Sequence, residues 1–232
     1  MTEHTLRQYD IELEEVRRGV LNMGGLAETQ VVKAIEGLRS GQLDLLDTVI
    51  EGDKPINLAQ IELDDDCSHI IAKRQPAAGD LRLVLSVIKI ASDLERIGDE
   101  AKKIAKAARR LHSAEAPFVP RVGLTQAVEL ALELLRASLD AFARVNPEGI
   151  EDLRRKDAEI DAGFKGVMRQ LITYMMEDPR TISRCIELLF VAKAIERIGD
   201  HAKNMAQYAV YMANGEDVRH GGIEAIERAA RD

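Results

Sequence analysis

Apolar residues recur at steps of three and four along most of the chain, which is the spacing of one face of an α-helix. Turn-forming stretches interrupt this pattern and divide the chain into six predicted helices. We place these helices at residues 5–40, 43–73, 79–112, 121–145, 150–177 and 180–213. The breaks are "SGQ", "RQPAAGD", "APFVP", "NPEG" and "EDPR". All but "APFVP" are typical of turns between antiparallel helices, and Gly52 and Pro55 predict a kink inside the second helix.

The third helix of each half carries the same apolar seam. In the first half the seam consists of Val87, Ile90, Leu94, Ile97, Ala101, Ile104, Ala108 and Leu111. Adding 101 to each number gives Leu188, Val191, Ile195, Ile198, Ala202, Met205, Ala209 and Met212, all of them apolar. Both helices therefore bury the same face. We predict an all-α protein of two tandem three-helix bundles related by an internal repeat, at residues 1–112 and 121–213, with a C-terminal tail at 214–232.

Composition narrows the class of protein. Of the 232 residues, 46% are hydrophobic and 31% charged, while 3% are aromatic, which fits a globular chain with an aliphatic helical core. A formal net charge of −8, without a run of Lys and Arg, argues against direct binding of nucleic acid. We see no signal peptide and no apolar stretch long enough to span a membrane, and expect a cytoplasmic protein. Cys67 and Cys185, in separate helices, are interpreted as reduced core residues.

The strongest motif is Glu-Arg-Ile-Gly-Asp, which occurs once in each third helix, at residues 95–99 and 196–200. A glycine inside a helix costs about 1 kcal/mol relative to alanine, so Gly98 and Gly199 indicate a purpose other than helix stability. We interpret each glycine as leaving the neighbouring carboxylates uncovered, so that other ligands or a partner's backbone can approach. A charged pair on a helix is usually a solvated surface, but repetition at equivalent positions favours a function.

The repeated carboxylates are candidate metal ligands. By helical geometry they lie opposite the apolar seam, and like charges four residues apart repel unless a cation lies between them. The second helix of each half offers a further oxygen pair, with Asp64 further along the same line in the first half. The two predicted clusters are Asp53 and Asn57 with Glu95 and Asp99, and Asp157 and Asp161 with Glu196 and Asp200. Such clusters suit divalent or trivalent ions (Fe, Zn, Mn or Mg), and Asn57 makes the first cluster weaker by one charge.

Enzymatic readings remain as the alternative. A di-iron oxygenase bundle requires Glu-x-x-His on two helices with the ligands in the core, whereas His201 is five residues from Glu196. A metal-dependent hydrolase or oxidase would use the same carboxylates beside a substrate pocket. No nucleophile with a base and no phosphate-cradling loop is identifiable, so we expect a non-enzymatic protein. The position of Glu95 and Glu196 in the structure would distinguish a regulator from an enzyme: an exposed ridge favours a regulator, and a deep cleft favours an enzyme.

With these motifs in view, the chain resembles PhoU-type phosphate-signalling proteins over nearly its whole length. The resemblance rests on "NMGG", "VIEGDKPIN", "IIAKRQPAAGDLRLVLS", both "ERIGD" copies, "RQLITYMMEDPRTI" and "VRH". It implies a pair of three-helix bundles, and multinuclear metal clusters on the two quartets named above. Asn57 departs from an all-carboxylate pattern.

The resemblance also implies a role. Proteins of this type are negative regulators of the phosphate-starvation response that restrain phosphate uptake. They connect the ATPase of a phosphate ABC transporter to a membrane sensor histidine kinase, and so are peripheral at the membrane through these partners. We also expect a homodimer. Charged residues at the hairpin turns, namely Arg74, Asp80 and Arg180, are candidate partner contacts because they lie away from the apolar seams.

Overall fold

Every secondary-structure element of the part of the chain that is described is helical. The computed structural model describes residues 2–113, 122–146 and 150–218. The elements are α1 (Thr2–Ser40), α2 (Leu43–Glu51), α3 (Asp53–Arg74), α4 (Ala78–Ser113), α5 (Thr125–Arg144), α6 (Ile150–Glu177), the short 3-10 helix η1 (Pro179–Thr181) and α7 (Ile182–Asn214). The whole predicted "APFVP" break, most of the 214–232 tail and residues 147–149 of "NPEG" lie outside the described residues.

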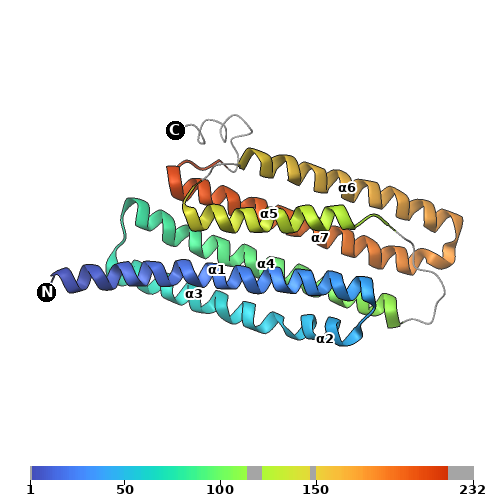
Figure 1. Cartoon of the computed structure of the whole chain (residues 1–232), viewed down its shortest axis with the longest axis horizontal. Coiled ribbons are helices and arrows are strands. Elements are labelled where there is room, and N and C mark those ends of the chain that lie inside the picture. Colours follow the sequence, from blue (N-terminus) through green and yellow to red (C-terminus); the bar gives the residue numbers. More distant parts are fainter. Residues whose placement is uncertain (1, 114–121, 147–149, 219–232) are drawn as a thin grey trace.

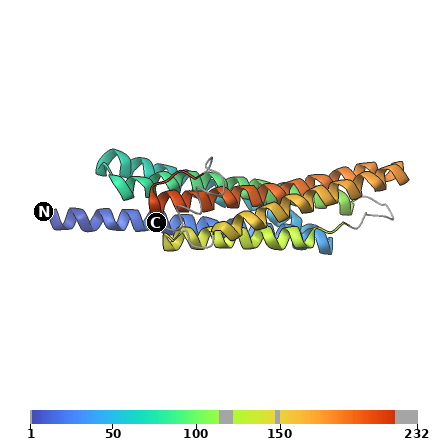
Figure 2. The same ribbon diagram turned by 90° about the horizontal axis from the view of Figure 1, so that it is seen from above.

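The helices run side by side along one long axis (Figure 1). α1 to α4 form one half and α5 to α7 the other, as the repeat predicts. The start of α1 extends beyond its neighbours at one end of the molecule (Figure 2). None of the described helices is long and apolar enough to cross a membrane.

The predicted second helix is divided into α2 and α3 at Gly52. The Gly52 N–H donates to the carbonyl of Thr48 and ends α2, and Gln30 Nε2 of α1 donates to the Gly52 carbonyl at 3.2 Å. A Cβ on Gly52 would overlap the Gln30 amide and would lie 2.9 Å from the backbone oxygen of Thr48. The Gln30 side chain can turn away, but the Thr48 carbonyl cannot, so this position favours glycine. Pro55 lies in the first turn of α3, where a missing N–H costs no helical hydrogen bond.

α4 and α7 form the centre of the molecule and pack antiparallel (Figures 1 and 2). Polar contacts link them along their length: Arg82 with Met212, Ser86 with Tyr208, Asp93 with His201, and Arg110 with Glu187. Ile97 and Ile198, which are equivalent in the repeat, lie near the middle of this series. An approximate two-fold axis therefore passes between the two central helices and relates the halves.

The core is continuous across the two halves. Each residue of the two predicted seams is at most 4% exposed. One apolar cluster extends from Val16 of α1 through α4 and α7 to Val218, and a smaller one lies at the turn end of the α6 and α7 hairpin. Cys67 and Cys185 are both buried free thiols, as predicted. The bundles are thus two halves of one packed body, because the seams that each half would otherwise expose are buried at its centre.

Candidate functional site

The two glycines of the repeated motif face the second helix of their own hairpin at close range. A Cβ built on Gly98 would lie 2.9 Å from Cδ1 of Ile56, and one built on Gly199 would lie 2.9 Å from Cδ1 of Ile160. Both isoleucines are fully buried. The interpretation that these glycines keep the carboxylates open to an outside ligand was wrong. The space beside each glycine is filled by an isoleucine of the facing helix, which stands three residues after Asp53 or Asp157.

The carboxylates of the motif are mostly shielded from solvent, so they do not form the exposed ridge expected of a regulator. The side chains of Asp53, Glu196 and Glu95 are 7%, 12% and 19% exposed, whereas Asp200 is 44% exposed. The predicted direction of the carboxylates around the helix axis was right, but the conclusion that this side of the helix faces solvent was wrong. α4 and α7 are central helices, so the face opposite the seam meets the second helix of the same hairpin instead of water.

The first hairpin gathers Asp53, Asn57, Glu95 and Asp99. Lys102 Nζ donates to Asp53 Oδ2 at 2.6 Å, and Asn57 Nδ2 donates to the same oxygen at 3.3 Å. The other oxygens, Asp53 Oδ1 and Asn57 Oδ1, are buried without a hydrogen-bond partner. Burial raises the pKa of Glu95, and the nearby charges of Asp99 and Asp53 raise it further. The described residues of this hairpin therefore leave some of its negative charge unbalanced and some of its acceptor oxygens without a hydrogen-bond donor.

In the second hairpin a lysine joins Asp157 and Asp200, and the charge of Asp161 acts on Asp157. Lys203 Nζ donates to Asp157 Oδ2 at 2.7 Å and to Asp200 Oδ1 at 2.9 Å, and so joins α6 to α7. Burial raises the pKa of Asp157, the lysine opposes that shift, and Asp200 and Asp161 add to it. Burial lowers the pKa of Lys203, but its bonds to the two carboxylates outweigh this and the net shift is upward.

Glu196 pairs with a different lysine from the one that joins Asp157 and Asp200. Lys193 Nζ, one turn earlier on α7, donates to Glu196 Oε1 at 2.6 Å. The same ammonium group lies 5.4 Å from the centre of the Phe164 ring on α6. A cation near an aromatic face is attracted to it, so both contacts favour this position of Lys193. Glu196 thus has a lysine partner of its own on the same helix.

The side-chain oxygens of the predicted residues are of the chemical type that binds a hard cation. Carboxylate and amide oxygens are the ligands that Mg²⁺, Mn²⁺ and similar ions take, and Asp53 Oδ1 and Asn57 Oδ1 are buried acceptors that lack a donor. Within the described ranges, however, no three His, Cys, Asp or Glu side chains converge closely enough to hold one ion. Lysine ammonium groups contact the carboxylates instead. Metal binding by the eight predicted residues stays a prediction.

Lys102 and Lys203 were not among the predicted site residues, although the sequence held a signal for them. They are 101 residues apart, the same interval as the two motifs, and each follows the aspartate of its motif by three positions. At that spacing a lysine lies on the same face of the helix as the aspartate. Extending the repeat by one helical turn would have found both residues.

The hairpin turns differ in what holds them. Arg74 forms a two-pronged ion pair with Glu12 of α1, at 2.9 Å from Nε and 2.6 Å from Nη2, and the Tyr9 hydroxyl donates to Asp80 at 2.9 Å. Arg74 and Asp80 are thus engaged by α1, which reduces their availability as partner contacts. Arg180 is exposed and pairs with Asp178 within its own turn. Of the three predicted contacts, Arg180 is the one on an open surface.

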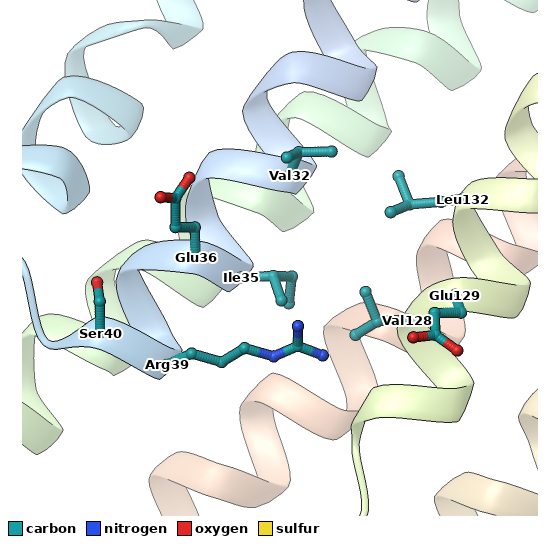
Figure 3. Close-up of a pocket in the computed structure, with 8 residues that line it drawn as sticks. All are labelled: Val32, Ile35, Glu36, Arg39, Ser40, Val128, Glu129 and Leu132. Atoms are coloured by element: carbon teal, nitrogen blue, oxygen red, sulfur yellow. The ribbon is translucent and has the colours of Figure 1, made fainter.

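Two pockets lie away from the carboxylate clusters. One is an apolar groove of about 390 Å³ between α1 and α5, in which Val32 and Ile35 face Val128 and Leu132, with Arg39 reaching across (Figure 3). The other lies between α1 and α3 and is lined by Gln8, Glu12, Glu15, Asp65, Asp66, His69 and Ile70. A hydrolase or oxidase needs a substrate pocket beside its metal ligands, and neither pocket has one of the predicted ligands in its wall.

Comparisons with known proteins agree with this architecture. The PhoU domain model matches residues 20–108 and again residues 124–209, one match in each half. The chain is 42% identical to the phosphate-specific transport system accessory protein PhoU of Serratia marcescens, over 98% of this chain and 93% of that protein. It is 40% identical to the protein of the same name from Escherichia coli K12, over 98% and 94%.

Solved structures give the same result. The crystal structure of PhoU from Pseudomonas aeruginosa is 40% identical, with a TM-score of 0.85 over 90% of this chain and all of that one. The structure of the phosphate transport system regulatory protein PhoU from Streptococcus pneumoniae is 30% identical, with a TM-score of 0.82 over 90% and 99%. Both the tandem domain matches and the length of these alignments show that the chain belongs to the PhoU family.

Proposed function

We propose that this protein is a regulatory accessory protein of phosphate transport, which restrains phosphate uptake and the phosphate-starvation response. The observation that carries the proposal is the match along 98% of the chain to proteins named as accessory to a phosphate-specific transport system. Relatives with that name come from Serratia marcescens and Escherichia coli K12, and a structural neighbour is named as a regulatory protein. The role is taken to be non-enzymatic, as the word accessory implies.

In this proposal the protein acts as an adaptor between the ATPase of a phosphate ABC transporter and a sensor histidine kinase. The long helical faces support it, because helices that bury only one side leave extended surfaces for partners. Exposed apolar side chains lie on the outer faces of the second hairpin, among them Met176, Ile186 and Phe190. Contacts with partners would place the protein at the membrane surface without a spanning helix of its own.

Metal ions are part of the same proposal. Asp53, Asn57, Glu95 and Asp99 would hold ions in the first hairpin, and Asp157, Asp161, Glu196 and Asp200 in the second. A bound cation would supply the positive charge that the unpartnered oxygens of Asp53 and Asn57 lack. Ligands from both helices of a hairpin would then be held together by the bound cation. The cation would thereby determine how rigid the hairpin is when a partner binds.

A deletion strain tests the regulatory role. Removing the gene should switch on a phosphate-starvation reporter in phosphate-rich medium, and restoring the intact chain should repress it. A reporter that stays repressed in the deletion strain would reject the proposal. A pull-down of the transporter ATPase and of the sensor kinase, with and without chelator, then tests the adaptor role and its dependence on metal.

The metal assignment has its own test. Glu196→Ala with Asp200→Ala should lower the metal content of the purified protein by elemental analysis, whereas Lys165→Ala, an exposed residue on α6 outside the cluster, should leave it unchanged. Both variants should be checked for an unchanged fold by circular dichroism. Equal metal content in the two variants would show that the ligands lie elsewhere.

A further inference from the structure

The turn end of the second hairpin carries large apolar side chains that are exposed to solvent on both helices. α6 and α7 meet at this turn at one end of the long axis (Figure 1), and the turn end extends beyond the other described helices (Figure 2). The exposed side chains are Ile172 (46%) and Met176 (80%) on α6, and Ile182 (40%), Ile186 (41%) and Phe190 (58%) on α7. A group of exposed apolar side chains at an extremity of the molecule indicates a binding surface, whereas single ones are common.

These side chains lie on one side of the hairpin. Lys193 of α7 lies over the Phe164 ring of α6, so this pair marks a side that both helices share. Residues four or seven positions apart lie on the same side of a helix. Steps of four from Phe164 lead along α6 to Met168, Ile172 and Met176, and a step of seven back from Lys193 leads to Ile186, with Ile182 and Phe190 four residues to either side. We call these six apolar residues between Met168 and Phe190 the tip face.

Two cations flank the tip face on α6. Lys165 and Arg169 are exposed, and they precede Met168 and Ile172 by three residues. That spacing places each cation beside the apolar row. Although the whole chain has a formal net charge of −8, this part of its surface combines apolar side chains with positive charge.

The equivalent face of the first hairpin has a different character. The aspartates and the isoleucines that pack on the motif glycines are 104 residues apart in the second helices of the two hairpins, which sets the correspondence. By that interval Lys165, Met168, Arg169, Ile172 and Met176 correspond to Ile61, Asp64, Asp65, Ser68 and Ala72. The shared packing therefore does not require an apolar and basic surface here, and the second hairpin has one for another reason.

We propose that the tip face binds directly to the surface of an anionic phospholipid bilayer. Apolar side chains of an amphipathic surface enter between the lipid headgroups, while lysine and arginine remain beside the phosphates. The rest of the acidic molecule is repelled by such a membrane, so the protein binds with its turn end toward the lipid. The inference goes beyond the proposed function, because this contact needs neither a metal ion nor a protein partner.

The shape of the tip face favours a bilayer over a peptide helix. A peptide helix docks into a hydrophobic groove. Neither of the two pockets described above has a tip-face residue in its wall, and the most exposed side chain, Met176, projects at the very end of α6. Six apolar residues and two cations provide a weak and reversible contact, which is strengthened when a membrane-bound partner holds the protein nearby.

Sedimentation of the full-length protein with lipid vesicles tests the proposal. Vesicles that contain phosphatidylglycerol should sediment severalfold more protein than vesicles of phosphatidylcholine alone, and high salt should reduce the difference because it screens the charges. Failure of the wild-type protein to sediment with phosphatidylglycerol vesicles would overturn the proposal.

Two pairs of variants with matched controls locate the contact. Ile186→Ser with Phe190→Ser should lower binding to phosphatidylglycerol vesicles severalfold, whereas Ile11→Ser with Leu26→Ser, at residues of α1 that are 44% and 41% exposed, should leave it unchanged. Lys165→Glu with Arg169→Glu should also lower it severalfold, and Arg7→Glu with Arg18→Glu, at exposed residues of α1, should lower it much less for the same change in net charge. Circular dichroism checks that each variant is folded. Equal losses in a tip-face variant and its control would overturn the assignment of the surface.

A pull-down with the same variants separates lipid from protein as the occupant. The tip-face variants should still bind the transporter ATPase and the sensor kinase as detergent-solubilised proteins. Variants that sediment with vesicles as the wild type does, but lose one of these partners, would show that the tip face binds a protein, and would overturn the membrane proposal while leaving the adaptor role standing.

Discussion

The two hairpins of this protein repeat their packing closely but differ in how their charges are satisfied. In both, an isoleucine packs against the motif glycine so closely that its Cδ1 would lie 2.9 Å from a Cβ built on that glycine. In the first, one lysine meets one carboxylate, while in the second one lysine joins two carboxylates. Both hairpins keep buried carboxylate oxygens without a hydrogen-bond donor, such as Asp53 Oδ1 in the first and Glu196 Oε2 in the second. Close contact between helices fixes the apolar part of a hairpin, whereas the polar residues beside it are free to diverge as long as a cation is present.

The largest expected effect concerns the shared packing. Ile56→Ala and Ile160→Ala should each lower the free energy of unfolding by about 2–5 kcal/mol, because each leaves a cavity against a glycine. Adding Gly98→Ala or Gly199→Ala should restore part of the loss, since the new methyl enters the vacated space and alanine favours the helix by about 1 kcal/mol. Denaturant titration of chelated protein measures this. Unequal losses in the two hairpins, or no rescue by alanine, would contradict a common packing.

The next effect sharpens the difference in charge. In chelated protein, Lys203→Met should lower the free energy of unfolding by about 1–3 kcal/mol, since two carboxylates lose a charged hydrogen bond. Lys102→Met should cost less, because only Asp53 loses its lysine. Lys165→Met, a change at an exposed residue of α6 outside the clusters, serves as the control, and thermal denaturation gives the comparison. A greater loss for Lys102→Met would reverse the ranking of the two bridges.

The two hairpin turns should also respond differently. Arg74→Ala breaks a two-pronged pair with Glu12 that ties α3 to α1, and should lower the free energy of unfolding measurably. Arg180→Ala removes an exposed pair within the second turn and should leave the free energy of unfolding nearly unchanged. Urea titrations of the two variants suffice. If Arg180→Ala nevertheless weakens binding of a partner, its role is at the surface and not in the fold.

The smallest expected effect is the change in the free energy of unfolding when the motif glutamate is replaced by glutamine. Its sign differs between the two hairpins. Burial and Asp99 raise the pKa of Glu95, so the folded protein favours its protonated form, and this contribution to stability is lost as pH rises through the folded pKa. Glu95→Gln should therefore stabilise metal-free protein by about 0.5 kcal/mol at neutral pH, with the gain disappearing below about pH 4. Glu196→Gln gives up the Lys193 contact and should instead destabilise by about 0.3–1 kcal/mol. Thermal melts across pH 4 to pH 8 would show both trends, and a pH-independent gain for Glu95→Gln would exclude titration of Glu95 as its cause.

The fold was predictable because its helices follow a strong 3.6-residue period and end at explicit turn residues. Both seams and the equivalence of the halves follow from that periodicity, and the structure buries each seam residue. The break at Gly52 was expected as a kink, but the hydrogen bond from the Gln30 amide on α1 to its carbonyl joins segments distant in the sequence and could not be predicted.

The candidate site was predictable only in part. The spacing of the motifs identified which carboxylates share a face, but not what that face meets, because burial of Glu95 depends on α3 packing over α4. Likewise Ile56 and Lys102 reach the cluster from opposite helices of the hairpin, at a register that periodicity alone does not give. A helical repeat thus specifies directions around an axis, while the distance to a neighbouring helix is settled by packing.

The apolar seam shared by α4 and α7 bears on how such a chain could arise. Either half by itself would present a long aliphatic strip to water, and a strip related to its counterpart by a two-fold axis is satisfied by another copy of itself. A gene that encoded a single half would therefore produce a symmetric pair with the outline of the present molecule. Joining two such copies in one chain would remove the need for them to find each other. Each copy would then be free to accumulate its own substitutions, such as Asn57 where the second half has Asp161.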